Sequence, residues 1–221
     1  IRKEDYFREN GGIIFPNPNA PTGVAMPLAE VEEIVVHNRD AVVIIDEAYV
    51  DFGAQSAVSL VDKYDNLLVV QTFSKSRSMA GMRIGFAVGD SKLIAYLNDV
   101  KYSFNSYTMD RTALAAGVAA VKDREYFDRT CCKIIETREW TKKELKKLGF
   151  SFEDSMANFI FAAHESCPAE ELFQALRNHH IYVRYFPGKR TGNHLRITIG
   201  TQKEMEVLIE FLRNYLNEQK Y

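Results

Sequence analysis

The sequence has few of the features that mark a membrane, secreted or nucleic-acid-binding protein. No apolar run approaches the length needed to cross a bilayer. The formal net charge of −2 gives no general attraction to nucleic acid or to anionic lipid. The cysteines are three, an odd number without ligand spacing, namely Cys131, Cys132 and Cys167. We therefore expect reduced thiols in a cytoplasmic protein.

Metal-site patterns, repeats and low-complexity tracts are also missing from the sequence. The five histidines show no convincing ligand spacing, so no metal is expected. What remains is an ordinary globular composition, 46% apolar and 26% charged. A chain of 221 residues can bury a sizeable core in one or two domains.

The apolar pattern of the first half predicts strands that alternate with helices. Expected strands are 12–15, 41–45, 67–71 and 83–88, and expected helices are 27–38 and 107–121. Continuous β-branched runs such as 41–45 are typical of strands buried on both faces. This part therefore predicts an α/β fold, a mostly parallel sheet with flanking helices.

The pattern changes in the second half, after a long amphipathic helix expected at 125–148. Gly149 follows as a plausible glycine at the helix end. Shorter elements come next: strands at 157–163, 181–185 and 194–199, and helices at 169–178 and 203–219. We expect a large domain at 1–123 and a small C-terminal α+β domain at 124–221.

Polar and charged residues follow directly on three of the expected strands. They are Asn17 to Asn19, Asp46 and Lys75. In open α/β sheets, ligands bind at the carboxyl ends of the strands, so these residues are expected to share one site.

Lys75 lies in a loop between two apolar strands. An amine that forms a Schiff base must be positioned and partly desolvated, and this context suits that role. The alternative is a solvated surface charge, which is what most lysines are.

Asp46 ends an apolar strand, where an unpaired carboxylate is costly. A pyridinium nitrogen would be a suitable cationic partner and would stay protonated beside it. The alternatives are a helix N-cap or a salt bridge to an arginine. Tyr49, three residues later, could donate a hydrogen bond to a ring oxygen, or could simply pack in the core.

Further candidates surround these two. Arg83 can hold a phosphate through two hydrogen bonds, and Thr72 and Ser74 offer hydroxyls beside it, although both could serve only local loop bonds. Arg184 and Arg196 lie in otherwise apolar strand-like segments, where each needs a partner. A substrate anion and an internal salt bridge are the two options.

Together these residues resemble the aspartate-aminotransferase superfamily of pyridoxal-5′-phosphate enzymes, fold type I. Within it the chain is most similar to the histidinol-phosphate aminotransferases. The resemblance rests on five short segments in a fixed order, which are 17–23 (NPNAPTG), 46–49 (DEAY), 74–75 (SK), 81–83 (GMR) and 195–200 (LRITIG).

The resemblance implies a cofactor, pyridoxal 5′-phosphate, and a catalytic set. Lys75 would bind the cofactor aldehyde and shuttle a proton, Asp46 would pair with the pyridine nitrogen, and Tyr49 would contact the ring oxygen. It also implies a fold, the large domain of fold type I followed by a small domain.

The same resemblance implies how the anionic groups are held. Thr72, Ser74 and Arg83 would bind the cofactor phosphate. Arg196 would pair with the substrate carboxylate or its equivalent anionic end, and Arg184 would lie toward the phosphate of histidinol phosphate.

The sequence departs from the family pattern in two ways. Where the family has Asn directly before Pro-Thr-Gly, this chain has Ala20, and Asn19 lies one residue earlier. Asn19 therefore remains a candidate contact to the ring oxygen only through a rearranged loop. The resemblance also covers only the C-terminal two-thirds of a family member. We expect an N-terminal part to be missing, and weak cofactor binding if the protein begins at Ile1.

The function implied is ping-pong transamination between L-histidinol phosphate and 2-oxoglutarate in histidine biosynthesis, by a cytoplasmic homodimer. Two enzyme alternatives share the architecture, an aromatic amino-acid aminotransferase and a phosphothreonine decarboxylase. A non-catalytic aminotransferase-like binding domain is the alternative from another class.

Overall fold

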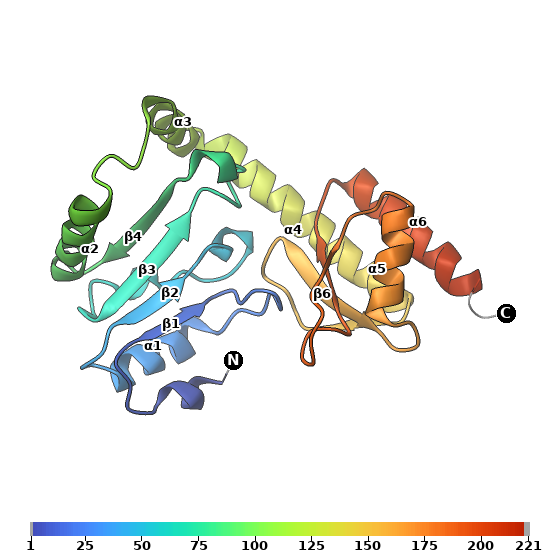
Figure 1. Cartoon of the computed structure of the whole chain (residues 1–221), viewed down its shortest axis with the longest axis horizontal. Coiled ribbons are helices and arrows are strands. Elements are labelled where there is room, and N and C mark those ends of the chain that lie inside the picture. The colour runs from blue at the N-terminus through green and yellow to red at the C-terminus, as the bar shows by residue number, and fades with distance from the viewer. Residues whose placement is uncertain (1, 219–221) are drawn as a thin grey trace. The chain divides into compact units, whose positions relative to one another are not determined.

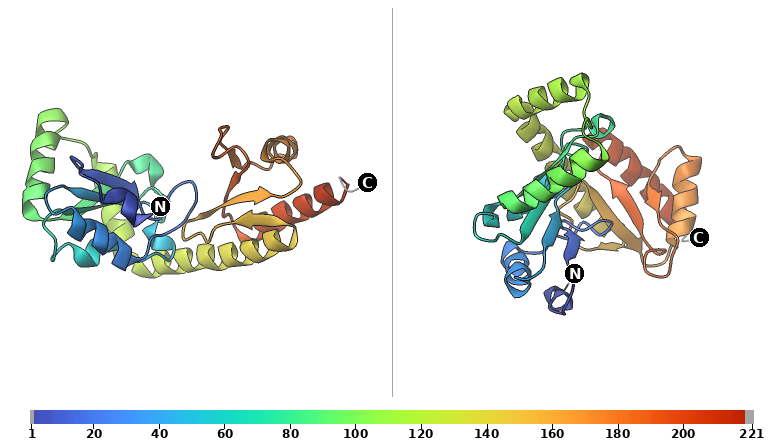
Figure 2. Two further views of the ribbon diagram at one scale, coloured as in Figure 1. Left: turned by 90° about the horizontal axis from the view of Figure 1, so that it is seen from below. Right: turned by 60° about the vertical axis from the view of Figure 1, so that its left-hand side comes forward.

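The computed structural model describes residues 2–218, which form two compact units (Figures 1 and 2). The first unit extends to Asn19 and resumes from Ala25 to Arg129. The second takes the short segment Ala20–Val24 and begins again at Thr130. The domain boundary predicted at residue 123 stays a prediction.

The first unit contains a four-stranded sheet in the order β1-β2-β3-β4 (Figure 1). Its strands are β1 (Ile13–Pro16), β2 (Val43–Asp46), β3 (Leu67–Thr72) and β4 (Gly85–Gly89). The first three run parallel, and β4 pairs antiparallel with β3. The predicted α/β fold with a mostly parallel sheet is confirmed.

The core of this unit forms because apolar residues from the sheet and from one helix meet. Helix α1 (Leu28–His37) contributes Val31, Ile34 and Val35, which are all fully buried. They pack with Val43 and Ile45 of β2 in one cluster. The continuous apolar run of β2 therefore forms a central strand, as its composition predicts.

Three-residue and four-residue 3₁₀ turns connect these elements. They are η1 (Lys3–Tyr6), η2 (Val50–Phe52), η3 (Ala57–Leu60) and η4 (Ala80–Met82). Two of them, η2 and η3, fill the connection between β2 and β3. Tyr49 lies in this connection and directly precedes η2.

The helical region after β4 differs from the expected single helix at 107–121. It consists of α2 (Ser91–Phe104) and α3 (Arg111–Lys122). Asp110 starts α3 because its carboxylate accepts a hydrogen bond from the Ala113 N–H (2.7 Å). Asp90 caps α2 in the same way, through Lys92.

The small residues of α3 allow close packing, whereas α2 lies on the surface. A Cβ at Gly117 of α3 would stand 3.0 Å from Ile84, and Ala113 packs with Phe73 and Ile84. Within the described part of the chain, α2 contains no buried side chain. It was not among the predicted elements.

The second unit is built on an antiparallel sheet in the order β5-β6-β8-β7. Its strands are β5 (Phe150–Phe152), β6 (Phe159–His164), β7 (Arg184–Tyr185) and β8 (Leu195–Thr198). Its helices are α5 (Ala169–Asn178) and α6 (Gln202–Glu218), preceded by α4 (Arg124–Lys147), which begins in the first unit.

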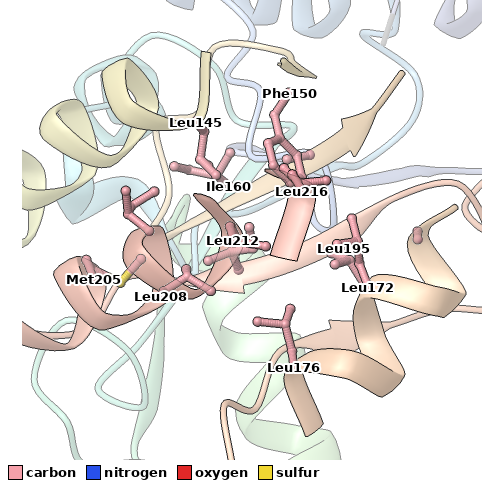
Figure 3. Close-up of a cluster of buried hydrophobic side chains, with 14 of the residues drawn as sticks. Leu145, Phe150, Ile160, Leu172, Leu176, Leu195, Met205, Leu208, Leu212 and Leu216 are labelled. Atoms are coloured by element: carbon pink, nitrogen blue, oxygen red, sulfur yellow. The ribbon is translucent and has the colours of Figure 1, made fainter. Parts of the chain in front are cut away.

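Three helices and the sheet share one core in the second unit (Figure 3). Leu145 of α4, Leu172 of α5 and Leu212 of α6 each have at most 1% of their surface exposed. They surround Ile160 of β6 and Leu195 of β8. The helical periodicity of the sequence predicted the three helices.

Several predicted elements of the second unit differ in length. The strand expected at 181–185 is only the two-residue β7, since pairing with β8 covers Arg184 and Tyr185 alone. Strand β5 was not predicted. The helix expected at 203–219 is α6, and Gln219 lies outside the described residues.

Two simpler features of the chain concern its thiols and its helices. Within residues 2–218, Cys131, Cys132 and Cys167 form no disulfide, and of the three only Cys132 is exposed. Of the helices described between residues 2 and 218, none combines the length and apolarity needed to cross a membrane.

The α6 packing gives a testable prediction. Leu212→Ala should lower the free energy of unfolding by about 2–5 kcal/mol, because it leaves a cavity in the core. Val207→Ala on the same helix, at a side chain 51% exposed, should change it by less than about 1 kcal/mol. Urea denaturation of both variants measures the difference. Equal effects would contradict the packing described.

Candidate active site

The ends of β2 and β3 bring the two halves of the candidate site together. In the parallel register Asp46 lies opposite Val70. The Glu47 N–H then donates to the Val70 carbonyl (2.8 Å), so the ladder continues one residue past β2. On the other side, the Asp46 carbonyl accepts from the Asn17 N–H (2.9 Å). The backbone at Asp46 is thus held by both neighbouring strands.

The Asp46 carboxylate keeps accepting capacity for a further partner. Its Oδ1 accepts one hydrogen bond, from the Ala48 N–H (3.0 Å). It does not cap a helix, because η2 begins at Val50 and Tyr49 holds the cap position. Within residues 2–218, Asp46 forms no salt bridge with an arginine. Neither alternative to a cofactor partner is therefore realised.

Lys75 and Tyr49 lie close to one another although 26 positions separate them in the numbering. The Lys75 Nζ stands 5.5 Å from the centroid of the Tyr49 ring, a cation–π distance. Lys75 is exposed, and its loop follows β3. Tyr49 follows β2 and Lys75 follows β3, so the neighbouring ends of these two parallel strands bring the ring and the amine together.

Hydroxyl groups gather at the end of β3, beside Lys75. The Thr72 Oγ1 lies 2.9 Å from the Ser74 Oγ and accepts from the Ser74 N–H (3.1 Å). It also lies 3.1 Å from the Ile84 carbonyl. The local loop bonds that were the alternative role for Thr72 and Ser74 are therefore present, and they orient both hydroxyls.

Arg83 stands in a left-handed conformation (φ 56°) just before β4. Its guanidinium donates one hydrogen bond, from Nη1 to the Ala80 carbonyl (2.8 Å), and the side chain is exposed. Among the residues that the structure describes, no carboxylate pairs with it. The remaining N–H groups can bind an anion such as a phosphate.

Asn17 braces the asparagine loop after β1. The buried Asn17 side chain bonds to the Met26 N–H (2.7 Å) and to the Met26 carbonyl (3.2 Å). Asn19 belongs to the first unit, while Ala20 belongs to the second. Asn19 stays a predicted cofactor contact.

Gly23 fixes the other end of this loop. It adopts φ +79°, and a Cβ there would come within 2.2 Å of the Ser155 Oγ. Its carbonyl accepts from the Met156 N–H (2.8 Å). Only glycine therefore fits this position.

Arg184 and Arg196 lie directly opposite one another on β7 and β8 of the second unit. Residues paired in this way project from the same face of a sheet, and like charges there repel. Both guanidinium groups lie near the Phe186 ring, at 5.2 and 5.5 Å. Across the described chain, neither arginine has a carboxylate partner, and the Arg196 Nε is buried without a hydrogen bond. The internal salt bridge considered for these residues is absent there.

His194 directly precedes β8 and lies two residues before Arg196. Its ring stacks on Phe161 at 4.5 Å between centroids, and its Nδ1 is buried without a hydrogen bond to any described residue. Burial lowers the pKa of His194 below its ordinary value.

Sequence reasoning missed the residues that support the site from behind. Glu47 is buried and binds Ser56, Ala57 and Gln71. The sequence did contain a signal for Glu47. A second carboxylate directly follows Asp46 at the end of a buried strand, and a carboxylate there needs hydrogen-bond partners.

Among residues 2–218, no cluster of three His, Cys, Asp or Glu side chains could hold a metal ion.

Comparison with known proteins identifies the family of this chain. The chain matches the family aminotransferase class I and II over residues 2–212, and it belongs to that family. The predicted resemblance to this superfamily is confirmed.

Individual relatives make the likeness more specific. The chain is 52% identical to the histidinol-phosphate aminotransferase of Brachyspira hyodysenteriae, over 95% of this chain and 59% of that protein. It is 54% identical to that of Pseudomonas putida, over 96% and 61%. The crystal structure of the histidinol-phosphate aminotransferase from Clostridium acetobutylicum matches with a TM-score of 0.86 at 25% identity, over 94% of this chain and 64% of that one. The chain thus spans about three-fifths of the length of these curated relatives.

The buried His194 predicts a pH dependence. The unfolded chain takes up a proton near pH 6.5, whereas the folded state resists it because the pKa is lowered. Stability should therefore be lost as the pH falls from about 6.5 through the lower folded pKa. Unfolding free energies measured across this range should show the loss in the wild type and a smaller loss in His194→Asn. The same slope in both would contradict the assignment.

Proposed function

We propose that this chain carries the cofactor lysine and the substrate arginines of a pyridoxal-phosphate-dependent aminotransferase. The proposed reaction moves an amino group between an amino-acid-like substrate and a 2-oxo acid. We further propose that the two substrates are L-histidinol phosphate and 2-oxoglutarate. The observation that carries the proposal is Lys75 lying over Tyr49, beside the strand that ends in Asp46.

Pyridoxal phosphate supplies an aldehyde that amines attack and a ring that accepts electrons. The residues present fit its three functional parts. Asp46 would pair with the ring nitrogen, since its Oδ1 accepts only one hydrogen bond, and Tyr49 would contact the ring oxygen. Thr72, Ser74 and Arg83 present donors to a phosphate. Asn19 is a further candidate contact.

Lys75 has two tasks in this proposal. Its amine would hold the cofactor through the aldehyde, and its Nζ would take up and return the proton that the substrate loses. Its position in a short loop at the end of β3 restricts where the amine can reach. Tyr49 is the aromatic surface against which it rests.

The arginine pair supports a substrate with a strong negative charge. Two guanidinium groups on the same face without a carboxylate partner among the described residues are unfavourable unless an anion neutralises them. A phosphate monoester meets this need, since its oxygens accept several charge-assisted bonds. We assign Arg196 to the substrate carboxylate or its equivalent anionic group, and we place Arg184 toward the phosphate of histidinol phosphate.

The proposal includes a homodimer in the cytoplasm, with the cofactor site completed by parts of a longer chain or of a second copy. Curated relatives extend well beyond the stretch that they share with this chain. An aromatic aminotransferase and a decarboxylase of a phosphorylated amino acid are the competing activities. A non-catalytic domain is the competing class.

Lys75 gives the direct test of the cofactor site. The chain mixed with pyridoxal phosphate and reduced with borohydride should retain the label, and peptide mapping should find it on Lys75. Lys75→Arg should lose the label because its guanidinium does not form the bond. Lys92→Arg, at an exposed lysine of the same unit, should keep it. An unlabelled wild type would favour the non-catalytic domain.

Arg184 gives the test of the substrate. In the full-length enzyme, Arg184→Gln should raise the KM for histidinol phosphate about 10–100-fold, the loss expected for charge-assisted bonds. Turnover of phenylalanine should change far less, because it has no phosphate. Arg190→Gln, at an exposed arginine in the following loop, is the matched control. A wild type that uses phenylalanine as well as histidinol phosphate would contradict the substrate.

A further inference from the structure

Glu47 follows Asp46 immediately, yet its side chain lies in the interior. Only 1% of its surface is exposed. Because neighbouring side chains of a strand point to opposite faces, Glu47 projects away from the face of Asp46. The two carboxylates therefore lie back to back at the end of β2.

Three donors converge on the Glu47 carboxylate. The Ala57 N–H donates to Oε1 (2.6 Å), and the Ser56 hydroxyl donates to Oε2 (2.6 Å). The Gln71 side-chain amide also donates to Oε2 (2.8 Å). Three donors on two oxygens suit a carboxylate, which only accepts. Burial raises the pKa of Glu47, while these bonds act in the opposite direction.

These bonds close the loop that carries Tyr49. The chain leaves β2 at Glu47 and returns to the same carboxylate at Ser56 and Ala57. The third bond extends to Gln71 in β3, which directly precedes Thr72. One side chain therefore joins the β2 end, the loop and the β3 end.

A second carboxylate in this loop reaches the lysine segment. The Ser76 hydroxyl donates to the Asp51 Oδ2 (2.5 Å), and Ser76 directly follows Lys75. Ser76 is buried, with 4% of its surface exposed. The loop that Glu47 closes is thus also attached to the residue next to Lys75.

We propose that Glu47 is a positioning residue, whose carboxylate fixes Asp46, Tyr49 and Thr72 relative to one another from the far side of the sheet. This inference rests on the proposed function, because the three residues that Glu47 positions are the proposed cofactor contacts. Its structural part concerns the chain alone and can be tested without cofactor.

Glu47→Gln is the informative substitution. It keeps the size of the side chain but leaves one accepting oxygen for three donors. At least one bond to Ser56, Ala57 or Gln71 is then lost or rearranged. The matched control is Glu9→Gln in the same unit, at an exposed side chain that makes no hydrogen bond within residues 2–218.

Amide hydrogen exchange of the cofactor-free chain is the first measurement. Glu47→Gln should speed exchange in segment 48–57 about tenfold, the factor that corresponds to the loss of one buried hydrogen bond. Exchange in the second unit should stay as in the wild type, and Glu9→Gln should change neither. Unchanged exchange at 48–57, or equal acceleration throughout the chain, would overturn the proposal.

Cofactor binding is the second measurement. Glu47→Gln should raise the dissociation constant for pyridoxal phosphate about tenfold. It should also shift the pH at which the visible absorbance band of the bound cofactor changes. A merely destabilised variant would keep that pH. A tenfold effect on exchange with an unchanged dissociation constant and pH would overturn the positioning role.

The outcomes separate this inference from the proposed function. A wild type that binds no pyridoxal phosphate contradicts the proposed function, while the exchange experiment still decides whether Glu47 holds the loop. If Glu47→Gln does not fold, Gln71→Met removes one arm of the network and should speed exchange at 48–57 about threefold. Gln174→Met, at an exposed residue of α5, is its control. No difference between these two variants would overturn the inference.

Discussion

The parallel register of β2 and β3 is the constraint on which the candidate site depends. It aligns Asp46 with Val70 and brings the loops that carry Tyr49 and Lys75 to one edge of the sheet. A slip of one residue would turn Asp46 inward and Glu47 outward, because side chains alternate between faces. The partners of Glu47 oppose this slip, since their bonds to its carboxylate would be lost if the side chain turned to the other face.

The charged residues proposed to bind substrate differ from those that support the fold, because the former have no internal partner of opposite charge among the described residues. Glu47 is buried and fully bonded, so it serves the fold. Arg184 and Arg196 face each other, and neither pairs with a carboxylate in the described chain. An arrangement that is unfavourable in the free protein is favourable once an anion is bound. In this proposal the stability of the fold depends on Glu47, whereas binding of the substrate anion depends on Arg184 and Arg196.

Local patterns predicted much of this structure, and non-local contacts explain the rest. The buried strands and the long helix α4 were predictable from residue periodicity. The family was predictable from short motifs around Asp46 and Lys75. Glu47 was not, because its partners Ser56 and Gln71 are distant in sequence. The length of β7 depends on its pairing with β8, which periodicity does not contain. The roles of the site residues stay predictions.

A crystal structure of the chain soaked with pyridoxal phosphate tests the central claim most directly. The account predicts continuous density from the Lys75 Nζ to the cofactor and the Asp46 carboxylate within hydrogen-bonding distance of the ring nitrogen. The cofactor phosphate should lie against Thr72, Ser74 and Arg83. Cofactor bound elsewhere, or with its ring nitrogen turned away from Asp46, would contradict the account.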